Sequence, residues 1–145
     1  MKVLFVCTGN TCRSAMAEGL LKDLAEKNYF QIEVKSAGVF AFDGDEASKN
    51  AVLALKDMDI DIENHRSQSI SKELVEDADL ILTMSKSHRE SLIMNYPQMA
   101  DKIFLLNKYA FDEDKDIVDP FGRDIHNYEI TRDQILKALK NINWE

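Results

Sequence analysis

The stretch VLFVCTGNTCRS, residues 3–14, leads from an apolar run through a short loop into an amphipathic helical pattern. The run Val3–Val6 is typical of a buried strand, and the apolar residues after Ser14 recur at helical spacing. A strand that continues through a tight loop into a helix is the opening unit of a parallel α/β sheet. The stretch therefore predicts the fold class, and it places the loop where a strand ends and a helix begins.

The loop itself has the features of a phosphate-sized anion site. Cys7 and Arg13 bracket five residues, whose backbone N–H groups can turn inward. The N-terminus of the following helix points the positive end of its dipole at the same place. Gly9 lets the backbone approach an anion closely, and the planar guanidinium of Arg13 can hold two phosphoryl oxygens. The pattern predicts a dianion site that contains a thiol.

The position of Cys7 favours a reactive thiol. A free cysteine has a pKa of about 8.5, whereas one at a helix N-terminus beside a cation has a pKa of roughly 3.5 to 7.5. Ser14 follows the arginine, where its hydroxyl can bond the cysteine sulfur. We therefore expect Cys7 to be an ionised nucleophile at neutral pH. The alternative is a buried structural cysteine followed by a capping turn, and Gly9, Ser14 and the strand–helix context argue against it.

Length, charge and cysteine content indicate an ordinary cytoplasmic domain. The 145 residues suit one domain, residues 1–145. The net charge of -8 argues against sequence-independent nucleic-acid binding and against anionic membrane surfaces. The chain has neither a membrane-length apolar stretch nor a signal-peptide pattern. The spacing Cys7-x4-Cys12 fits neither a zinc knuckle nor a secreted disulfide framework, so no metal is expected.

The rest of the chain alternates strand-like and helix-like segments without a repeat. Strands are expected at residues 2–7, 31–36, 79–84 and 102–106. Helices are expected at residues 14–27, 46–58 and 85–96, followed by a closing helix that carries Ile135, Leu139 and Ile142. Such an order gives a small doubly wound, four-stranded parallel sheet flanked by helices, a flavodoxin-like three-layer α/β fold. Ligands bind at the carboxyl ends of the strands in such sheets, which is where the Cys7 loop lies.

Particular residues set the expected boundaries of these elements. Ser36-Ala37-Gly38 is expected to end the second strand, Asp45 to cap the second helix and Pro97 to stop the third. On the first helix, Glu18 and Lys22 are expected to form an i,i+4 pair. The opposite face of that helix carries the apolar residues Met16, Leu20, Leu21 and Leu24.

A thiol that attacks a phosphorylated side chain needs an acid to protonate the leaving group. The best candidate is Asp119 in the stretch IVDPFG, residues 117–122. Pro120 restricts the backbone there, and Phe121 is expected to form part of the wall of the substrate pocket. The alternative is that Asp-Pro merely starts a turn, and the Cys7 loop makes the catalytic interpretation the better one.

From the Cys7–Ser14 loop through Ser36-Ala37-Gly38 to Asp119-Pro120, the chain resembles the low-molecular-weight, cysteine-dependent protein phosphatases. The resemblance implies that Cys7 is the nucleophile, that Arg13 binds the phosphoryl group, and that Asp119 is the general acid and then the base. It implies that Asn10 and Ser14 brace the loop and stabilise the thiolate. It matches His65 to a histidine beside the loop, for which a purely structural role stays open. The residues expected to contact substrate are Thr8, Gly9, Asn10, Thr11, Cys12, Arg13, Ser14 and Phe121.

Two further histidines and an acidic run have no counterpart in this resemblance. His88 and His126 match nothing and are expected at the surface. The acidic run near the acid candidate is interpreted as a solvated surface, although it would also attract a cation. Its members are Asp112, Glu113, Asp114 and Asp116.

Thr11 departs from the tyrosine-specific members, in which the residue before the second cysteine is usually a bulky aliphatic one. It resembles the bacterial protein-arginine phosphatase branch. An aliphatic side chain packs on a phenyl ring, whereas a threonine hydroxyl can hydrogen-bond near a polar P–N linkage or orient the hydrolytic water. Thr11 therefore favours a guanidinium leaving group. A second departure follows Asp119-Pro120, where Phe121 and Gly122 replace the usual aromatics.

The sequence predicts a phosphatase that hydrolyses phosphoarginine on proteins through a phosphocysteine intermediate, with no metal or cofactor, and releases inorganic phosphate. A protein-tyrosine phosphatase is the alternative. An arsenate reductase is disfavoured, because that chemistry relays a disulfide to further cysteines and none follows Cys12. A silent phosphate-binding module is disfavoured because Cys7 and Asp119 are both present. Cys12 lies on the same tight loop as Cys7, so a reversible disulfide that shields the nucleophile is expected.

Overall fold

The apolar run near the N-terminus forms the central strand of the sheet. In the computed structural model, which describes residues 1–145, β1 (Lys2–Cys7) lies between β2 (Glu33–Gly38) and β3 (Leu80–Thr83). β4 (Ile103–Leu105) pairs with the far side of β3, and all three pairings are parallel. The strand order β2-β1-β3-β4 reverses direction beside β1, as a doubly wound sheet does. The predicted four-stranded α/β fold is confirmed.

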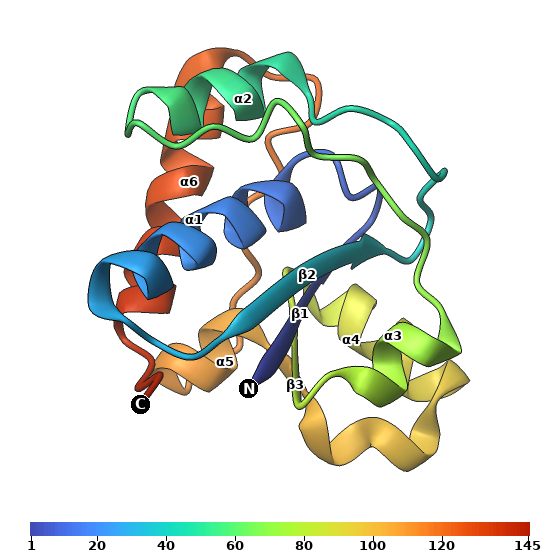
Figure 1. Ribbon diagram of the computed structural model, residues 1–145. Helices are drawn as coiled ribbons and strands as arrows, with labels where there is room; N and C mark the ends of the chain where they lie inside the picture. Colours follow the sequence, from blue (N-terminus) through green and yellow to red (C-terminus); the bar gives the residue numbers. More distant parts are fainter.

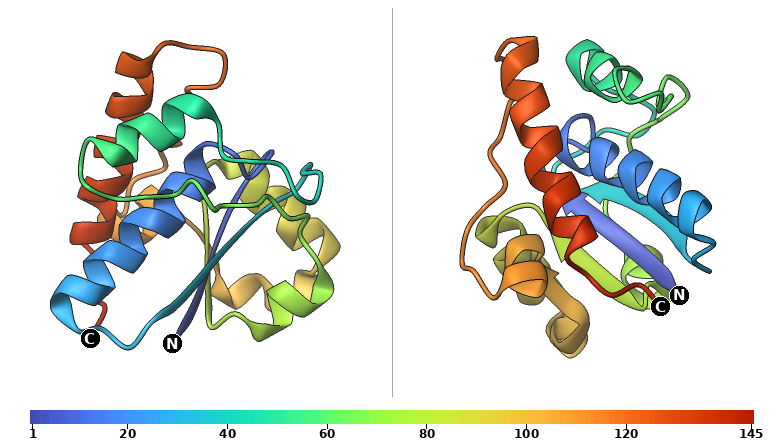
Figure 2. Two further views of the ribbon diagram at one scale, coloured as in Figure 1. Left: turned by 45° about the horizontal axis from the view of Figure 1, so that its top comes forward. Right: turned by 90° about the vertical axis from the view of Figure 1, so that its left-hand side faces the viewer.

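Helices cover both faces of this sheet (Figures 1 and 2). On one face lie α1 (Arg13–Asn28), α2 (Lys49–Lys56) and α6 (Ile125–Lys140), and α5 (Leu106–Phe111) packs against α6. On the other face lie α3 (Lys72–Asp77), α4 (Lys86–Asn95) and the 3₁₀ turn η1 (Pro97–Lys102).

Strand alternation divides β1 between the two cores. Val3 and Phe5 point into the larger core with α1, α2 and α6, whereas Leu4 and Val6 point into the smaller core with α3 and α4. All four side chains are almost fully buried, and each contributes about 1.5–3 kcal/mol by leaving water. This burial on both faces fixes β1 and therefore the position of the loop that follows it.

Helix α1 follows the expected pattern closely. Met16, Leu20 and Leu21 are buried, and Lys22 Nζ lies 2.5 Å from Glu18 Oε2 on the exposed side. A Cβ atom at Gly19 would come within 2.8 Å of Leu55 and Ile62 side chains, so the glycine allows the 55–62 segment to pack against the helix. Leu24 is partly buried against the same core.

Two expected boundaries are wrong because contacts distant in sequence set them. The second strand begins and ends two residues later than the expected range 31–36, because Ser36-Ala37-Gly38 forms the last three residues of β2, where Gly38 pairs with Cys7 and donates its N–H to the Gln68 carbonyl at 2.9 Å. Asp45 does not cap the second helix. Ser48 does, accepting the N–H of Ala51 at 3.3 Å, because backbone hydrogen bonds and a β-bridge hold residues 44–46 against residues 66–67.

The remaining elements agree with expectation except for three short ones. Pro97 ends α4 as predicted and begins η1, while η1, α3 and α5 have no counterpart in the sequence interpretation. Each has only six residues, too few for a clear helical repeat. Ile142 lies beyond the end of α6 but still packs on the larger core.

No helix in the structure has the length and apolar character needed to cross a membrane.

Candidate active site

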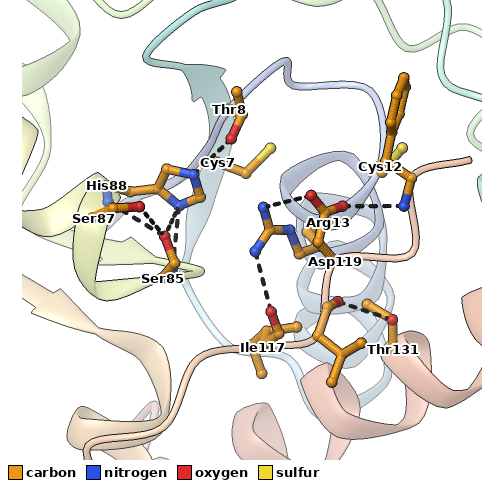
Figure 3. A network of polar contacts seen from close by, with 12 residues as sticks. Cys7, Thr8, Cys12, Arg13, Ser85, Ser87, His88, Ile117, Asp119 and Thr131 are labelled. Carbon is orange, nitrogen blue, oxygen red and sulfur yellow. Dashed lines mark hydrogen bonds and ion pairs between the residues drawn. The ribbon is translucent and has the colours of Figure 1, made fainter.

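Two segments distant in sequence meet at the carboxyl end of β1 (Figure 3). We call residues 7–14 the cysteine loop and residues 117–122 the acid segment. Together they line a cavity of about 260 Å³. Its lining residues are Cys7, Thr8, Gly9, Thr11, Cys12, Arg13, Asp119 and Phe121. The fold thus brings the predicted nucleophile, arginine and acid to one cavity.

Cys7 ends β1 and is only 3% exposed. Its Sγ lies 2.8 Å from the Ser14 hydroxyl oxygen, as the sequence predicts. Burial raises the pKa of the Cys7 thiol above its ordinary value, while the Ser14 hydroxyl, the backbone N–H groups of Ser14 and Asn10, and the Arg13 guanidinium act in the opposite direction. The expected low pKa is therefore not what the structure gives, because the loss of hydration outweighs the donors.

Asn10 is the internal brace of the cysteine loop. It is fully buried with a left-handed backbone (φ 58°), and its Nδ2 donates to Ser14 Oγ at 2.8 Å and to Ser36 Oγ at 2.9 Å. Its Oδ1 accepts the N–H of Gln68 at 3.0 Å. Its carbonyl accepts from His65 Nε2 at 2.7 Å, so His65 contacts the loop from outside. Side chains from β2 and the segment after α2 hold the loop in shape.

Arg13 joins the cysteine loop to the acid segment. The side chain is buried, one terminal nitrogen donates to the Ile117 carbonyl at 3.1 Å, and the other lies 3.5 Å from Asp119 Oδ2. The remaining donors of the guanidinium make no other hydrogen bond, which leaves them for an anion in the cavity.

Asp119 is held loosely by comparison. Its side chain is 54% exposed, and its Oδ1 accepts the N–H of Phe121 at 3.1 Å. The backbone of Val118, the residue before Asp119, is hydrogen-bonded to two side chains of α6. The Gln134 side chain accepts the N–H of Val118, and the Thr131 hydroxyl donates to its carbonyl. Phe121 stands at the rim of the cavity and is 75% exposed.

Thr11 and Cys12 face different surroundings. Thr11 is partly exposed in the cavity wall, whereas Cys12 is buried, with its Sγ 3.4 Å from the Tyr128 hydroxyl and 3.5 Å from that of Ser48. Both cysteines are free thiols. Burial raises the pKa of Tyr128 to about 12, so it faces Cys12 as a neutral phenol. The sequence interpretation missed Tyr128 and Ser48, which reach the loop only through the packing of α6 and α2.

His88 is not a surface residue, which corrects the expectation. It is 4% exposed, and its Nε2 lies 2.8 Å from the Thr8 hydroxyl oxygen on the cysteine loop. One signal was available: Ser85-x-x-His88 opens the helix that follows β3, the strand beside β1. His126 is exposed, as predicted.

The acidic run before the acid segment lies at the surface. Residues 112–116 are exposed, Asp112 pairs with Lys108 at 2.9 Å, and Asp116 accepts the backbone N–H of Lys86. The interpretation of this run as a solvated surface is confirmed. No group of three His, Cys, Asp or Glu side chains is arranged to hold a metal ion.

The comparisons with known proteins agree with this geometry. Residues 2–144 match the family described as low molecular weight phosphotyrosine protein phosphatase. A protein-arginine-phosphatase of Bacillus subtilis (strain 168) is 42% identical over 142 residues, which cover 98% of this chain and 94% of the relative. The low molecular weight protein-tyrosine-phosphatase PtpB of Staphylococcus haemolyticus is 37% identical over 139 residues, which cover 96% and 95%.

Solved structures show the same fold. The YwlE arginine phosphatase from Geobacillus stearothermophilus superposes with a TM-score of 0.91 at 41% identity, covering 97% of this chain and 88% of that one. A YwlE arginine phosphatase variant, in which a serine replaces a cysteine and the active-site serine is phosphorylated, superposes with a TM-score of 0.95 at 40% identity, covering 97% and 92%.

Proposed function

Because the chain belongs to the low molecular weight phosphotyrosine protein phosphatase family, we propose that this phosphatase acts on phosphoarginine in proteins through a phosphocysteine intermediate. The assignment of phosphoarginine as the substrate depends on the position of Thr11, which lines the cavity beside Cys7 and Asp119. A relative 42% identical to this chain is a protein-arginine-phosphatase, which supports the same substrate.

In the first step the thiolate form of Cys7, whose proton has passed to solvent, attacks phosphorus. An S–P bond forms as the P–N bond of phosphoarginine breaks, and Asp119 delivers its proton to the departing guanidino nitrogen. The loop N–H groups and Arg13 bind the equatorial oxygens, where negative charge gathers in the transition state. Arg13 is suited to this because its guanidinium is buried beside the cavity with donors unused.

In the second step the Asp119 carboxylate takes a proton from water. The water oxygen bonds to phosphorus, the S–P bond breaks, and inorganic phosphate and the Cys7 thiolate are released. The phosphorylated active-site serine of the related YwlE variant supports a covalent phosphoenzyme of this kind. Neither step needs a metal.

A hydroxyl in the cavity wall suits a P–N linkage better than a phenyl ester. The Thr11 hydroxyl supplies a hydrogen-bonding group where an aliphatic side chain would supply only apolar contact. A second candidate substrate is phosphotyrosine, which Phe121 favours, because its ring stands 75% exposed at the cavity rim and offers a surface for a phenyl group.

The test compares kcat/KM of the wild-type enzyme on two peptides of one sequence, one with phosphoarginine and one with phosphotyrosine. We expect the phosphoarginine peptide to be hydrolysed with the higher kcat/KM. A preference for phosphotyrosine would overturn the substrate assignment and support the second candidate. Loss of phosphate release in a Cys7→Ser control shows that the measured activity belongs to this site.

The remaining parts of the proposal follow from this activity. Phosphorylated proteins are its partners and inorganic phosphate is its product, and the expected place of action is the cytoplasm. An arsenate reductase or a silent phosphate-binding module fits less well, because no third cysteine exists for a disulfide relay and Asp119 stands at the cavity with Cys7.

A further inference from the structure

A chain of hydrogen bonds runs from α4 to the cysteine loop. Ser87 Oγ lies 2.9 Å from Ser85 Oγ, Ser85 Oγ lies 2.8 Å from His88 Nδ1, and His88 Nε2 lies 2.8 Å from Thr8 Oγ1. Figure 3 shows this chain approaching Thr8 on the side of Cys7 away from Arg13 and Asp119. Thr8 makes no other side-chain hydrogen bond in the structure.

The backbone fixes the direction of the hydrogen bonds in this chain. The N–H of Ser85 donates to His88 Nδ1 at 3.2 Å, and a backbone N–H can only donate. Nδ1 is therefore an acceptor, and the proton of the neutral imidazole lies on Nε2. His88 donates this proton to Thr8 Oγ1, so the hydroxyl of Thr8 accepts on that side and keeps its own proton for another partner.

The hydroxyl proton of Thr8 has no partner within the protein, because His88 is the only group hydrogen-bonded to Thr8 Oγ1. Thr8 is exposed and lines the cavity with Cys7, Arg13 and Asp119, so an acceptor bound in the cavity can take the place of water at this proton. Cys7 Sγ already has Ser14 as its side-chain partner. The strongest acceptor that the proposed reaction brings into this cavity is a phosphoryl oxygen.

We propose that Thr8 donates a hydrogen bond to the phosphoryl group of the substrate, and that His88 is the positioning residue that turns the Thr8 hydroxyl proton into the cavity. This inference rests on the cavity being the phosphoryl site and does not depend on which side chain carries the phosphate.

The surroundings of His88 keep its ring neutral. Burial and the Arg13 charge lower the pKa of His88, while Asp116 and Asp119 act against them, and the pKa falls from 6.5 to about 4. The ring therefore carries a single proton near neutral pH, and the direction of the hydrogen bonds does not change with pH there.

The first experiment reads this proton directly. The ¹⁵N NMR shifts of the His88 ring in the full-length protein at pH 7 should show an Nε2–H tautomer, with Nδ1 unprotonated. An Nδ1–H tautomer at that pH would overturn the proposal, because Nε2 would then accept the hydroxyl proton of Thr8 and that proton would point at His88. His126, which is exposed, provides the reference ring in the same spectrum.

The second experiment separates positioning from folding with two substitutions. His88→Asn keeps an acceptor near the place of Nδ1 for the N–H of Ser85, but it cannot reach Thr8. Thr8→Val removes the hydroxyl at nearly constant volume. Each variant should lose about tenfold in kcat/KM for a small aryl phosphate and bind inorganic phosphate about tenfold more weakly. His126→Asn is the matched control and should behave as wild type.

The double variant decides between the two roles of His88. If His88 acts through Thr8, adding His88→Asn to Thr8→Val costs no further activity, whereas a merely structural histidine would multiply the two losses. His88→Gln, whose amide reaches as far as Nε2, should restore most of the activity, and it also serves if His88→Asn does not fold. Multiplying losses, or phosphate affinity equal to wild type in Thr8→Val, would overturn the proposal.

Because the assay uses an aryl phosphate, its result does not depend on whether phosphoarginine is the substrate. An enzyme that cleaves aryl phosphate but not phosphoarginine contradicts the substrate proposed above and leaves the Thr8 and His88 comparison fully measurable.

Discussion

The cysteine loop and the acid segment differ in how firmly the fold holds them. Asn10, at the centre of the cysteine loop, is fully buried and hydrogen-bonded to four other residues. Asp119 has a half-exposed side chain, with Arg13 at 3.5 Å and the N–H of Phe121 as its polar contacts. The segment proposed to bind the anion is held rigidly by buried hydrogen bonds, whereas the segment proposed to move protons is open to solvent.

The largest effect on turnover is expected from substitution of Cys7, the first residue of the cysteine loop. Cys7→Ser should abolish turnover, because the hydroxyl is a far weaker nucleophile, while phosphate or vanadate still binds to the loop backbone and Arg13. Phosphate release and vanadate binding by calorimetry measure the two properties separately. Substantial remaining activity would refute the role given to Cys7, and lost anion binding would show that the thiol also shapes the loop.

The acid segment should show an effect that depends on the leaving group. Asp119→Asn is expected to lower kcat by about 10²- to 10⁴-fold on substrates with poor leaving groups and much less on good ones, because protonation matters most when the leaving group is poor. A series of aryl phosphates of graded phenol pKa measures this. Equal losses across the series would mean that Asp119 acts through its contact with Arg13 instead.

Thr11 belongs to the cysteine loop and lies in the cavity wall, where we propose that the leaving group of the substrate binds. Thr11→Ile should depress phosphoarginine hydrolysis and raise phosphotyrosine hydrolysis, since it removes a hydroxyl and adds apolar contact to a ring. The change in discrimination should be about 10- to 200-fold in paired kcat/KM values. A parallel fall on both substrates would show only that the loop tolerates no added bulk.

Ser14 tests how far the buried loop controls the thiol. Its hydrogen bond lowers the pKa of Cys7, so Ser14→Ala should raise that pKa, decrease the thiolate fraction at neutral pH and move the rising limb of activity to higher pH. The alkylation rate of Cys7 by iodoacetamide against pH measures the shift. Ser91→Ala on α4 is the control, and an unshifted Ser14→Ala profile would leave Arg13 and the backbone as the groups in control.

The smallest effect on basal activity is expected at Cys12. We expect peroxide to oxidise Cys7 and Cys12 to a reversible disulfide while it is reduced to water, with a loss of two hydrogen atoms in intact mass and recovery of activity with thiol. Cys12→Ser should keep near-normal activity before oxidation and recover poorly afterwards. Equal recovery of the variant would assign Cys12 a packing role beside Tyr128 alone.

Local sequence predicted the parts of the molecule that depend on neighbouring residues. The strand–loop–helix order around Cys7 follows from apolar periodicity, and the Cys7–Ser14 contact follows from one tight turn. Because only the eight residues 7–14 form this turn, their spacing alone brings the Cys7 thiol and the Ser14 hydroxyl together. Spacing within the sequence also predicted the apolar face of α1 and the Glu18–Lys22 ion pair on its exposed side.

The tertiary structure decided what depends on distant packing and on water. Ser48 instead of Asp45 caps α2 because residues 44–46 pair with the segment before α3, and His88 reaches Thr8 because β3 lies beside β1. The pKa of Cys7 rises because the folded chain removes its hydration, which no local spacing reveals. Residue order sets short-range geometry, but burial and long-range hydrogen bonds exist only once the sheet and its helices have assembled.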